Sequence, residues 1–123
     1  MNIMRSREIA SRILIGILSV LFIFASFAKI FGAKQITEMF VQWGLADWQI
    51  MIGFGLLIST VLFLVPATFS LGILFLSSYW GGAIVTHIIN ESSFLVPAVI
   101  LILVWVTAYI RNPKMFYTGR LKK

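Results

Sequence analysis

The sequence predicts an all-α integral membrane protein, a four-helix bundle with both termini in the cytoplasm. Of its 123 residues, 60% are hydrophobic and 11% are charged, whereas soluble domains have roughly 45–50% apolar and about 25% charged residues. The uncharged residues form long runs, and most of the basic residues lie beside the first and the last of these runs. Lipid is therefore the expected solvent for much of a single transmembrane domain over residues 1–123.

The first uncharged run extends from Ile13 to Ala28, between Arg12 and Lys29. Its 16 residues reach about 24 Å as a helix, and long flanking side chains bridge the rest of a hydrocarbon core of roughly 30 Å. We therefore predict a spanning helix over about residues 9–31. A basic start before an apolar stretch also leaves open a cleaved signal peptide.

The second run, from Trp48 to Asn90, has 43 residues without Asp, Glu, Lys or Arg, about twice the length of one span. Two helices must therefore form a hairpin. Pro66 disfavours helical structure at the residue before it, and Thr68 is a good N-cap residue. The predicted helices cover about residues 48–65 and 68–89.

The last run extends from Ser92 to Ile110 and is followed closely by Pro113. A cap at Ser92 or Ser93 and the proline as a stop signal predict a fourth helix over about residues 93–111, followed by a basic tail over 112–123. Strand-like alternation is absent, which argues against an outer-membrane barrel.

The loop over residues 32–47 is long for a connection within a bundle. Ile36, Met39, Phe40 and Trp43 lie in it at positions i, i+3, i+4 and i+7. This spacing predicts a short amphipathic helix in the first outside loop, at the interface or over the mouth of the bundle.

The basic residues predict the orientation. Eight of the ten flank the first and the fourth span on one side, namely Arg5, Arg7, Arg12, Arg111, Lys114, Arg120, Lys122 and Lys123. The other side has Lys29 and Lys34 with three of the four acids. Because cytoplasmic loops are rich in Lys and Arg, both termini are predicted cytoplasmic, in a multi-pass protein of the cell membrane, the inner membrane of a bacterium if the chain is prokaryotic. The net charge of +6 then reflects topology, and we predict no nucleic-acid partner.

Ionisable groups near apolar spans are energetically costly to bury in lipid, so their presence indicates a function or a bonding partner. Lys29 and His87 lie near the outer ends of the first and third spans, so the outer half of the bundle is predicted to bind a ligand. The predicted ligand-binding residues are His87, Lys29, Trp80, Tyr79, Glu38, Gln42 and Trp43. Two alternatives remain: Lys29 extends to the interface or pairs with Glu38 or Asp47, and His87 hydrogen-bonds across helices.

Small residues at helical spacing predict close contact between helices, because membrane helices associate through close packing. They are Gly55 and Ser59 in the second span and Ser77, Ser78, Gly81, Gly82 and Thr86 in the third.

The chain carries no nucleophile elbow, phosphate-binding loop, dinucleotide fingerprint or zinc-protease motif. Its single histidine and zero cysteines offer no spacing typical of a metal site and no thiolate chemistry. No catalytic residue is predicted, and whether the chain is an enzyme stays open.

The order of these features resembles the DoxX-like family of small four-helix membrane proteins, from about Arg12 to Pro113. The matching pieces are Ser26-Phe27-Ala28-Lys29-Ile30-Phe31, Trp43-Gly44-Leu45-Ala46, Ile52-Gly53, Gly81-Gly82-Ala83-Ile84-Val85-Thr86-His87 and Arg111-Asn112-Pro113. One departure is Leu56, because members commonly have an acidic residue a few positions after the glycine that matches Gly53. The departure removes an intramembrane partner for Lys29 or His87.

The resemblance implies a redox setting, since the family takes its name from a subunit of a thiosulfate:quinone oxidoreductase. It also implies a second possibility, since other relatives act as assembly factors. We therefore carry two hypotheses. The first is an accessory of a quinone-linked redox system that holds a lipophile, with quinone as its candidate cofactor. The second is a non-catalytic protein that binds another membrane protein or a second copy of itself.

Overall fold

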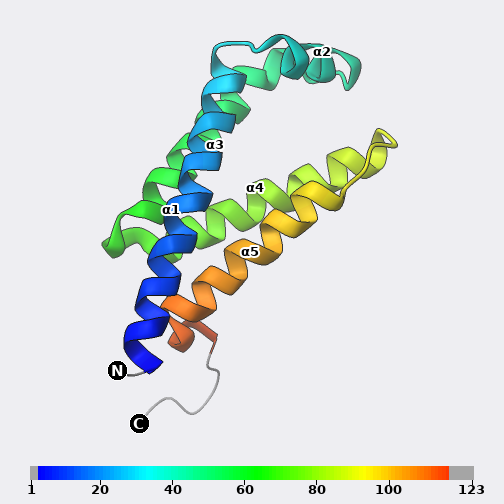
Figure 1. Ribbon diagram of the computed structural model, residues 1–123. Helices are drawn as coiled ribbons and strands as arrows, with labels where there is room; N and C mark the ends of the chain where they lie inside the picture. Colours follow the sequence, from blue (N-terminus) through cyan, green and yellow to red (C-terminus); the bar gives the residue numbers. More distant parts are fainter. Residues whose placement is uncertain (1–2, 117–123) are drawn as a thin grey trace.

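A computed structural model describes residues 3–116, and in this part of the chain every regular element is a helix (Figure 1). The five α-helices are α1 (Ile3–Ile30), α2 (Lys34–Gln42), α3 (Gln49–Leu64), α4 (Phe69–Ile89) and α5 (Leu95–Arg111). Short 3-10 helices are η1 (Ala46–Trp48), η2 (Pro66–Thr68) and η3 (Pro113–Phe116). The all-α prediction is confirmed for these residues. Residues 117–123, which include three of the predicted tail cations, lie outside the described part.

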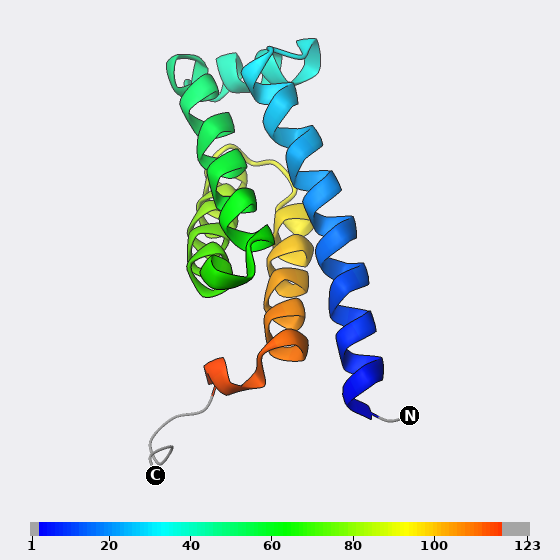
Figure 2. The same cartoon turned by 90° about the vertical axis from the view of Figure 1, so that its left-hand side faces the viewer.

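The four long helices form a closed ring. In the described part α1 contacts α3 and α5, and α4 also contacts α3 and α5. Figure 1 shows the α1–α3 pair and the α4–α5 pair meeting at one end and diverging at the other, where α2 overhangs the opening. The view in Figure 2 confirms that α1 and α5 run side by side while α3 and α4 form the other flank.

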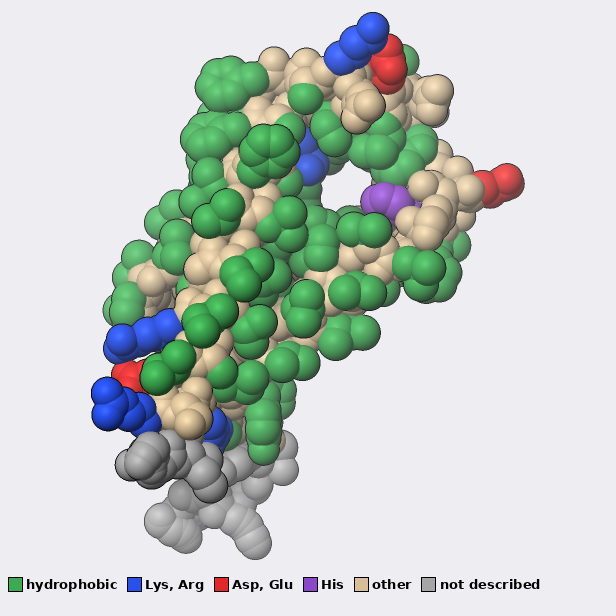
Figure 3. Space-filling model, viewed as in Figure 1, with side chains coloured by type: hydrophobic (Ala, Val, Ile, Leu, Met, Phe, Trp, Pro, Cys, Tyr) green, Lys and Arg blue, Asp and Glu red, His purple; other side chains and the backbone are tan. Residues whose placement is uncertain are grey.

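The outside of the bundle is apolar, as the hydrophobic side chains in Figure 3 show. Among the described residues, three segments are long and apolar enough to cross a membrane, Arg5–Ile30, Ala46–Leu64 and Pro66–Ile89, while α5 is apolar but shorter, with 17 residues. All four long helices carry exposed large apolar side chains, which suits a hydrocarbon solvent and not water.

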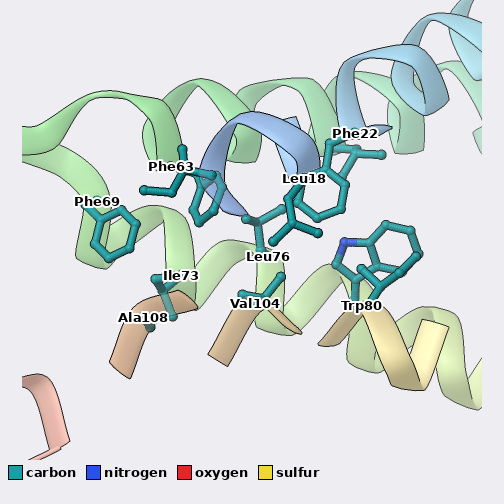
Figure 4. Packing of buried hydrophobic residues seen from close by; sticks show 12 residues of the cluster. Leu18, Phe22, Phe63, Phe69, Ile73, Leu76, Trp80, Val104 and Ala108 are labelled. Atoms are coloured by element: carbon teal, nitrogen blue, oxygen red, sulfur yellow. The ribbon is translucent and has the colours of Figure 1, made fainter. Parts of the chain in front are cut away.

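The core lies where the four long helices meet, and each helix contributes to it (Figure 4). Phe22 of α1, Leu56 of α3, Leu76 of α4 and Val104 of α5 are completely buried. Aromatic contacts extend this core, because the Phe22 ring lies 5.6 Å from the ring of Trp80. Leu56 therefore has a packing role at the position where the resembling family commonly has an acid.

The α3–α4 hairpin turns at the predicted place. Val65 is extended (φ −85°, ψ 121°), as expected before a proline. Thr68 occupies the N-cap position of α4, but its hydroxyl donates a hydrogen bond to the Leu62 carbonyl at 2.9 Å and makes no cap bond to α4. The predicted capping role of Thr68 is therefore wrong, and its side chain instead completes the end of α3.

The fourth helix begins later than predicted. Its first residue is Leu95 and its N-cap is Phe94, without a side-chain cap bond. Ser93 Oγ accepts a hydrogen bond from the Leu95 backbone N–H at 3.3 Å, so this serine acts in the turn before the helix. The delay follows from the end of α4, where Glu91 has a positive φ of 55° and Ser92 N–H donates to the His87 carbonyl at 2.8 Å.

The glycines that let helices approach closely are not the predicted ones. A Cβ added at Gly55, Gly81 or Gly82 would meet nothing within 4 Å, so the prediction that they pack against another helix of the same chain is wrong. The close approaches occur at Gly53, whose added Cβ would lie 2.9 Å from Ile30 Cγ1, and at Gly72, where it would lie 2.4 Å from the Phe63 nitrogen.

The hydroxyl groups of the predicted small residues make hydrogen bonds within their own helices. The hydroxyls of Ser59, Ser77 and Thr86 donate to the carbonyls four residues earlier, at 2.7–2.8 Å, and Ser78 is exposed. Such bonds hide a polar group in an apolar setting without joining two helices. None of these hydroxyls is therefore a link between helices in the described part.

The close contact at Gly72 makes a direct test. We expect Gly72→Ala to lower stability by about 1–3 kcal/mol, because the new methyl group would overlap the backbone of Phe63. Gly55→Ala is the matched control, since its methyl would enter open space and alanine favours a helix over glycine by roughly 0.5–1 kcal/mol. Thermal unfolding in detergent should show a loss for the first variant only; equal midpoints would contradict the packing at Gly72.

Candidate functional site

A cavity of about 280 Å³ lies in the opening between α2 and α4. Five of the seven predicted ligand-binding residues line it, namely Lys29, Trp43, Tyr79, Trp80 and His87, together with apolar residues such as Met39, Phe40 and Ile52. Figure 3 shows the opening on the surface, with the histidine at its rim. The prediction of a common site therefore agrees with the placement of these five side chains.

The other two predicted residues do not take part. Glu38 and Gln42 are exposed on α2 and are not among the residues that line the cavity. The face of α2 that turns inward carries Met39 and the buried Phe40 instead. The spacing of Met39, Phe40 and Trp43 puts these three on the inward face of the helix and leaves Glu38 and Gln42 off it, so the structure does not bring these two predicted residues into the cavity.

His87 is half-buried on the last turns of α4. Its Nδ1 lies 2.7 Å from the Ala83 carbonyl oxygen. A carbonyl only accepts hydrogen bonds, so we assign the proton to Nδ1, which leaves Nε2 of the neutral ring as an acceptor. The alternative of a hydrogen bond across helices is not realised, since this bond stays within α4. The imidazole instead meets another element through an edge contact with Trp43, at 4.8 Å between ring centroids.

Lys29 is half-buried at the end of α1. Its Nζ lies 6.0 Å from the centroid of the Tyr79 ring, a distance at the outer limit of a cation–π contact. The ion pair found between described side chains joins Glu8 and Arg12, at the other end of α1, and none joins Lys29 to Glu38 or Asp47. The alternative in which Lys29 pairs with Glu38 or Asp47 is therefore not realised, and the ammonium retains donor capacity toward the cavity.

Tyr79 and Trp80 form the inner wall, with ring centroids 5.0 Å apart in an edge contact. Trp80 belongs as much to the core as to the cavity, because it is 8% exposed and packs against Phe22. Its Nε1 has no hydrogen-bond partner among the described residues, and Figure 4 shows this nitrogen on the side of the ring that faces the core. Trp80 thus contributes a ring face to the wall.

One important residue of the site was not predicted from the sequence. Gln49, the first residue of α3, is 6% exposed, and its Nε2 donates to the Lys29 carbonyl and to Thr37 Oγ1, both at 3.0 Å. A single side chain thus joins the ends of α1 and α3 to α2. An amide between apolar residues at the start of a span was the available signal, since a polar group there needs a partner.

Gly44 fixes how the chain leaves α2. Its φ of 74° is readily adopted only by glycine. Its N–H donates to Val41 O at 3.1 Å, and the next N–H, of Leu45, donates to Phe40 O at 2.8 Å. This Schellman motif ends α2 and turns Trp43 and Leu45 toward the cavity wall.

Chemically, the site combines an aromatic and apolar interior with a primary ammonium and an imidazole acceptor supplied by different helices. Such a set suits a flat lipophilic molecule with polar groups at its edges. The described residues include no group of three or more His, Cys, Asp or Glu side chains suited to hold a metal ion.

In a comparison with known proteins, the model of the DoxX-like family matches residues 13–107, a segment that includes α2, the hairpin and every described residue that lines the cavity. No curated protein and no solved structure gives a significant match.

The Gln49 junction generates a prediction. Gln49→Leu leaves the Lys29 carbonyl and the Thr37 hydroxyl unpaired and should cost about 1–3 kcal/mol locally. Hydrogen–deuterium exchange of the α2 amides should accelerate in this variant, because the tether of α2 is lost. Gln42→Leu, at the exposed last residue of α2, should leave exchange in α2 unchanged. Similar protection of the α2 amides in both variants would show that Gln49 does not hold α2 in place.

Proposed function

The chain belongs to the DoxX-like family, and on this premise we propose that it is a multi-pass membrane protein that binds a lipophilic, quinone-like ligand for a membrane-associated redox system. The observation that carries this proposal is the cavity between α2 and α4, in which Lys29 and His87 line an otherwise aromatic and apolar space. Quinones dissolve in the bilayer, so a site built into the bundle near its end is accessible to them.

The proposed topology has four crossings with both termini in the cytoplasm. Three segments satisfy the length criterion outright, and the 17 residues of α5 lie at the lower end of the usual range of about 17–25. In the described part, Arg5, Arg7, Arg12 and Arg111 line one cavity, whereas Lys29 lies at the opposite end of α1. This segregation of arginine supports a cytoplasmic position for the first end.

The hydrogen-bonding roles follow from the tautomer of His87. A neutral ring with its proton on Nδ1 offers Nε2 as an acceptor for the hydroxyl of a quinol. After taking up that proton, the ring can donate to a quinone carbonyl. Lys29 supplies a second donor from α1. His87 and Lys29 therefore bind the edges of the ring, while Tyr79 and Trp80 pack against its face.

An accessory role fits the chain better than independent catalysis. The chain has no cysteine, so it offers neither a redox thiol nor the usual ligands of an iron–sulfur cluster. Electrons would therefore enter or leave a bound quinone through a partner protein, while this chain holds the ring and handles a proton.

The ligand can be tested by purification from native membranes followed by lipid extraction and mass spectrometry. We expect quinone with the wild-type protein and about tenfold less with Lys29→Met or His87→Gln, because each loses a charged or buried hydrogen bond worth roughly 1.5–3 kcal/mol. Lys34→Met is the matched control, since this lysine is exposed and does not line the cavity.

Wild-type protein that carries no more quinone than an unrelated membrane protein from the same cells would refute the proposal. Unchanged quinone-linked respiration in membranes from a His87→Ala strain would refute the redox role separately.

A second function, binding another membrane protein or a second copy of the chain, is favoured by the open space at two glycines. A Cβ added at Gly55 or Gly81 would meet no atom within 4 Å, so close contact there is available to an outside helix. Cross-linking in native membranes should then trap one defined partner, and Gly81→Leu should release it. Val61→Leu, on the exposed lipid-facing side of α3, is the control; recovery of uncross-linked monomer alone would exclude this function.

A further inference from the structure

A second and larger cavity, about 770 Å³, lies at the opposite end of the bundle from the candidate ligand site. It is formed between the first turns of α1 and the last turn of α5. Among its lining residues are Arg5, Arg7, Arg12 and Arg111 and one acid, Glu8, which give a net charge of +3. The positive-inside rule explains basic residues at this end of the bundle; their concentration in one concave site, in a chain with only 11% charged residues, is a further feature.

Among the described residues, the cavity contains more guanidinium groups than carboxylates. Glu8 pairs with Arg12 at 2.9 Å, and no other described carboxylate lines the cavity. Arg7 Nη2 lies 3.4 Å from the Ile110 carbonyl oxygen, which links α1 to α5. The Arg111 guanidinium lies 4.8 Å from the centroid of the Phe69 ring. The one described acid is therefore already engaged with Arg12, and the described lining has more basic than acidic side chains.

Guanidinium groups on two helices favour a phosphate group. The planar guanidinium matches phosphate oxygens with paired N–H donors, and charged hydrogen bonds of this type are stronger than neutral ones. Basic pockets between membrane helices on the cytoplasmic side bind the head groups of anionic lipids. The cavity is thus suited to a phosphate monoester or diester.

The surface next to the cavity favours a lipid as the source of that phosphate. Beyond Arg12, α1 presents a continuous apolar stripe to the outside, in which Ile13, Ile17 and Val20 are 56%, 61% and 70% exposed. These residues are spaced i, i+4 and i+7, so they share one face of the helix. Ile9, which is also exposed, continues this face back to the level of the arginines.

We propose that this cavity binds the phosphate of an anionic phospholipid, with the acyl chains of the lipid along the exposed face of α1. The lipid joins the start of α1 to the end of α5, where the ring of helices closes through the Arg7 contact. Binding therefore stabilises the bundle at this end and does not depend on the ligand proposed for the other cavity.

The test measures the thermal stability of the full chain in neutral detergent while one component is added at a time. Phosphatidylglycerol and cardiolipin should raise the unfolding midpoint, whereas phosphatidylcholine and inorganic phosphate should not. Arg7→Gln and Arg111→Gln should each weaken the apparent affinity for phosphatidylglycerol about tenfold, the loss expected for one charged hydrogen bond. Lys114→Gln is the matched control, because Lys114 is basic, exposed and near the same end but does not line the cavity.

Three outcomes would overturn the proposal: equal stabilisation by phosphatidylcholine, equal stabilisation by inorganic phosphate, or equal loss in Lys114→Gln and the arginine variants. The second outcome would assign the site to a free anion, and the third would reduce it to general surface charge. Arg7→Lys keeps the charge but not the paired donors, and it should retain the fold while losing part of the lipid effect. This variant separates lipid binding from a merely structural role of the Arg7–Ile110 contact.

Discussion

The close approach of α3 to the end of α1 is the constraint on which the rest of the structure depends. Gly53 lets the two backbones meet, since an added Cβ would lie 3.0 Å from Lys29 Cβ and 3.1 Å from the Ser26 carbonyl oxygen. One helical turn earlier, Gln49 donates to the Lys29 carbonyl. Residues four apart share a helix face, so one face of α3 both packs on α1 and satisfies a carbonyl that the helix end would leave without a partner. The position of Lys29 beside the cavity follows from these two contacts.

The two ends of the bundle differ because the same rule acts on different side chains. In hydrocarbon a polar group must find a partner inside the protein or reach the interface. At the α2 end, Gln49 and His87 bond to backbone carbonyls, at Lys29 and Ala83, and the space between them stays largely apolar. At the other end the side chains of Arg12 and Glu8 are 72% and 60% exposed, and charged groups gather there. One end is thus suited to a lipophile and the other to an anion.

Periodicity and charge predicted the helices well. Long runs without charge indicate segments that lie in lipid, and proline indicates where a helix ends. They could not identify which face of a helix meets a neighbour. A Cβ added at Gly55, Gly81 or Gly82, which have the predicted spacing for contact, would meet nothing within 4 Å, whereas one added at Gly72, which was not predicted, would lie against the backbone of Phe63. Five predicted site residues do line the cavity. They were predicted because polar and aromatic side chains near the ends of spans indicate a function or a bonding partner in lipid. This argument does not depend on knowing the helix face.

The end of α4 shows how a local backbone feature holds one side of the site. Glu91 has a left-handed conformation that is costly for a residue with a side chain, by roughly 1–2 kcal/mol. It is retained because the turn lets Ser92 N–H reach the His87 carbonyl at 2.8 Å, and α4 ends at Ile89, two residues after His87. With Nδ1 bound to Ala83 O and the ring edge against Trp43, His87 has little freedom to turn away from the cavity. A site at the open end of two diverging helix pairs needs such fixing, because the core that orders Trp80 does not extend as far as His87.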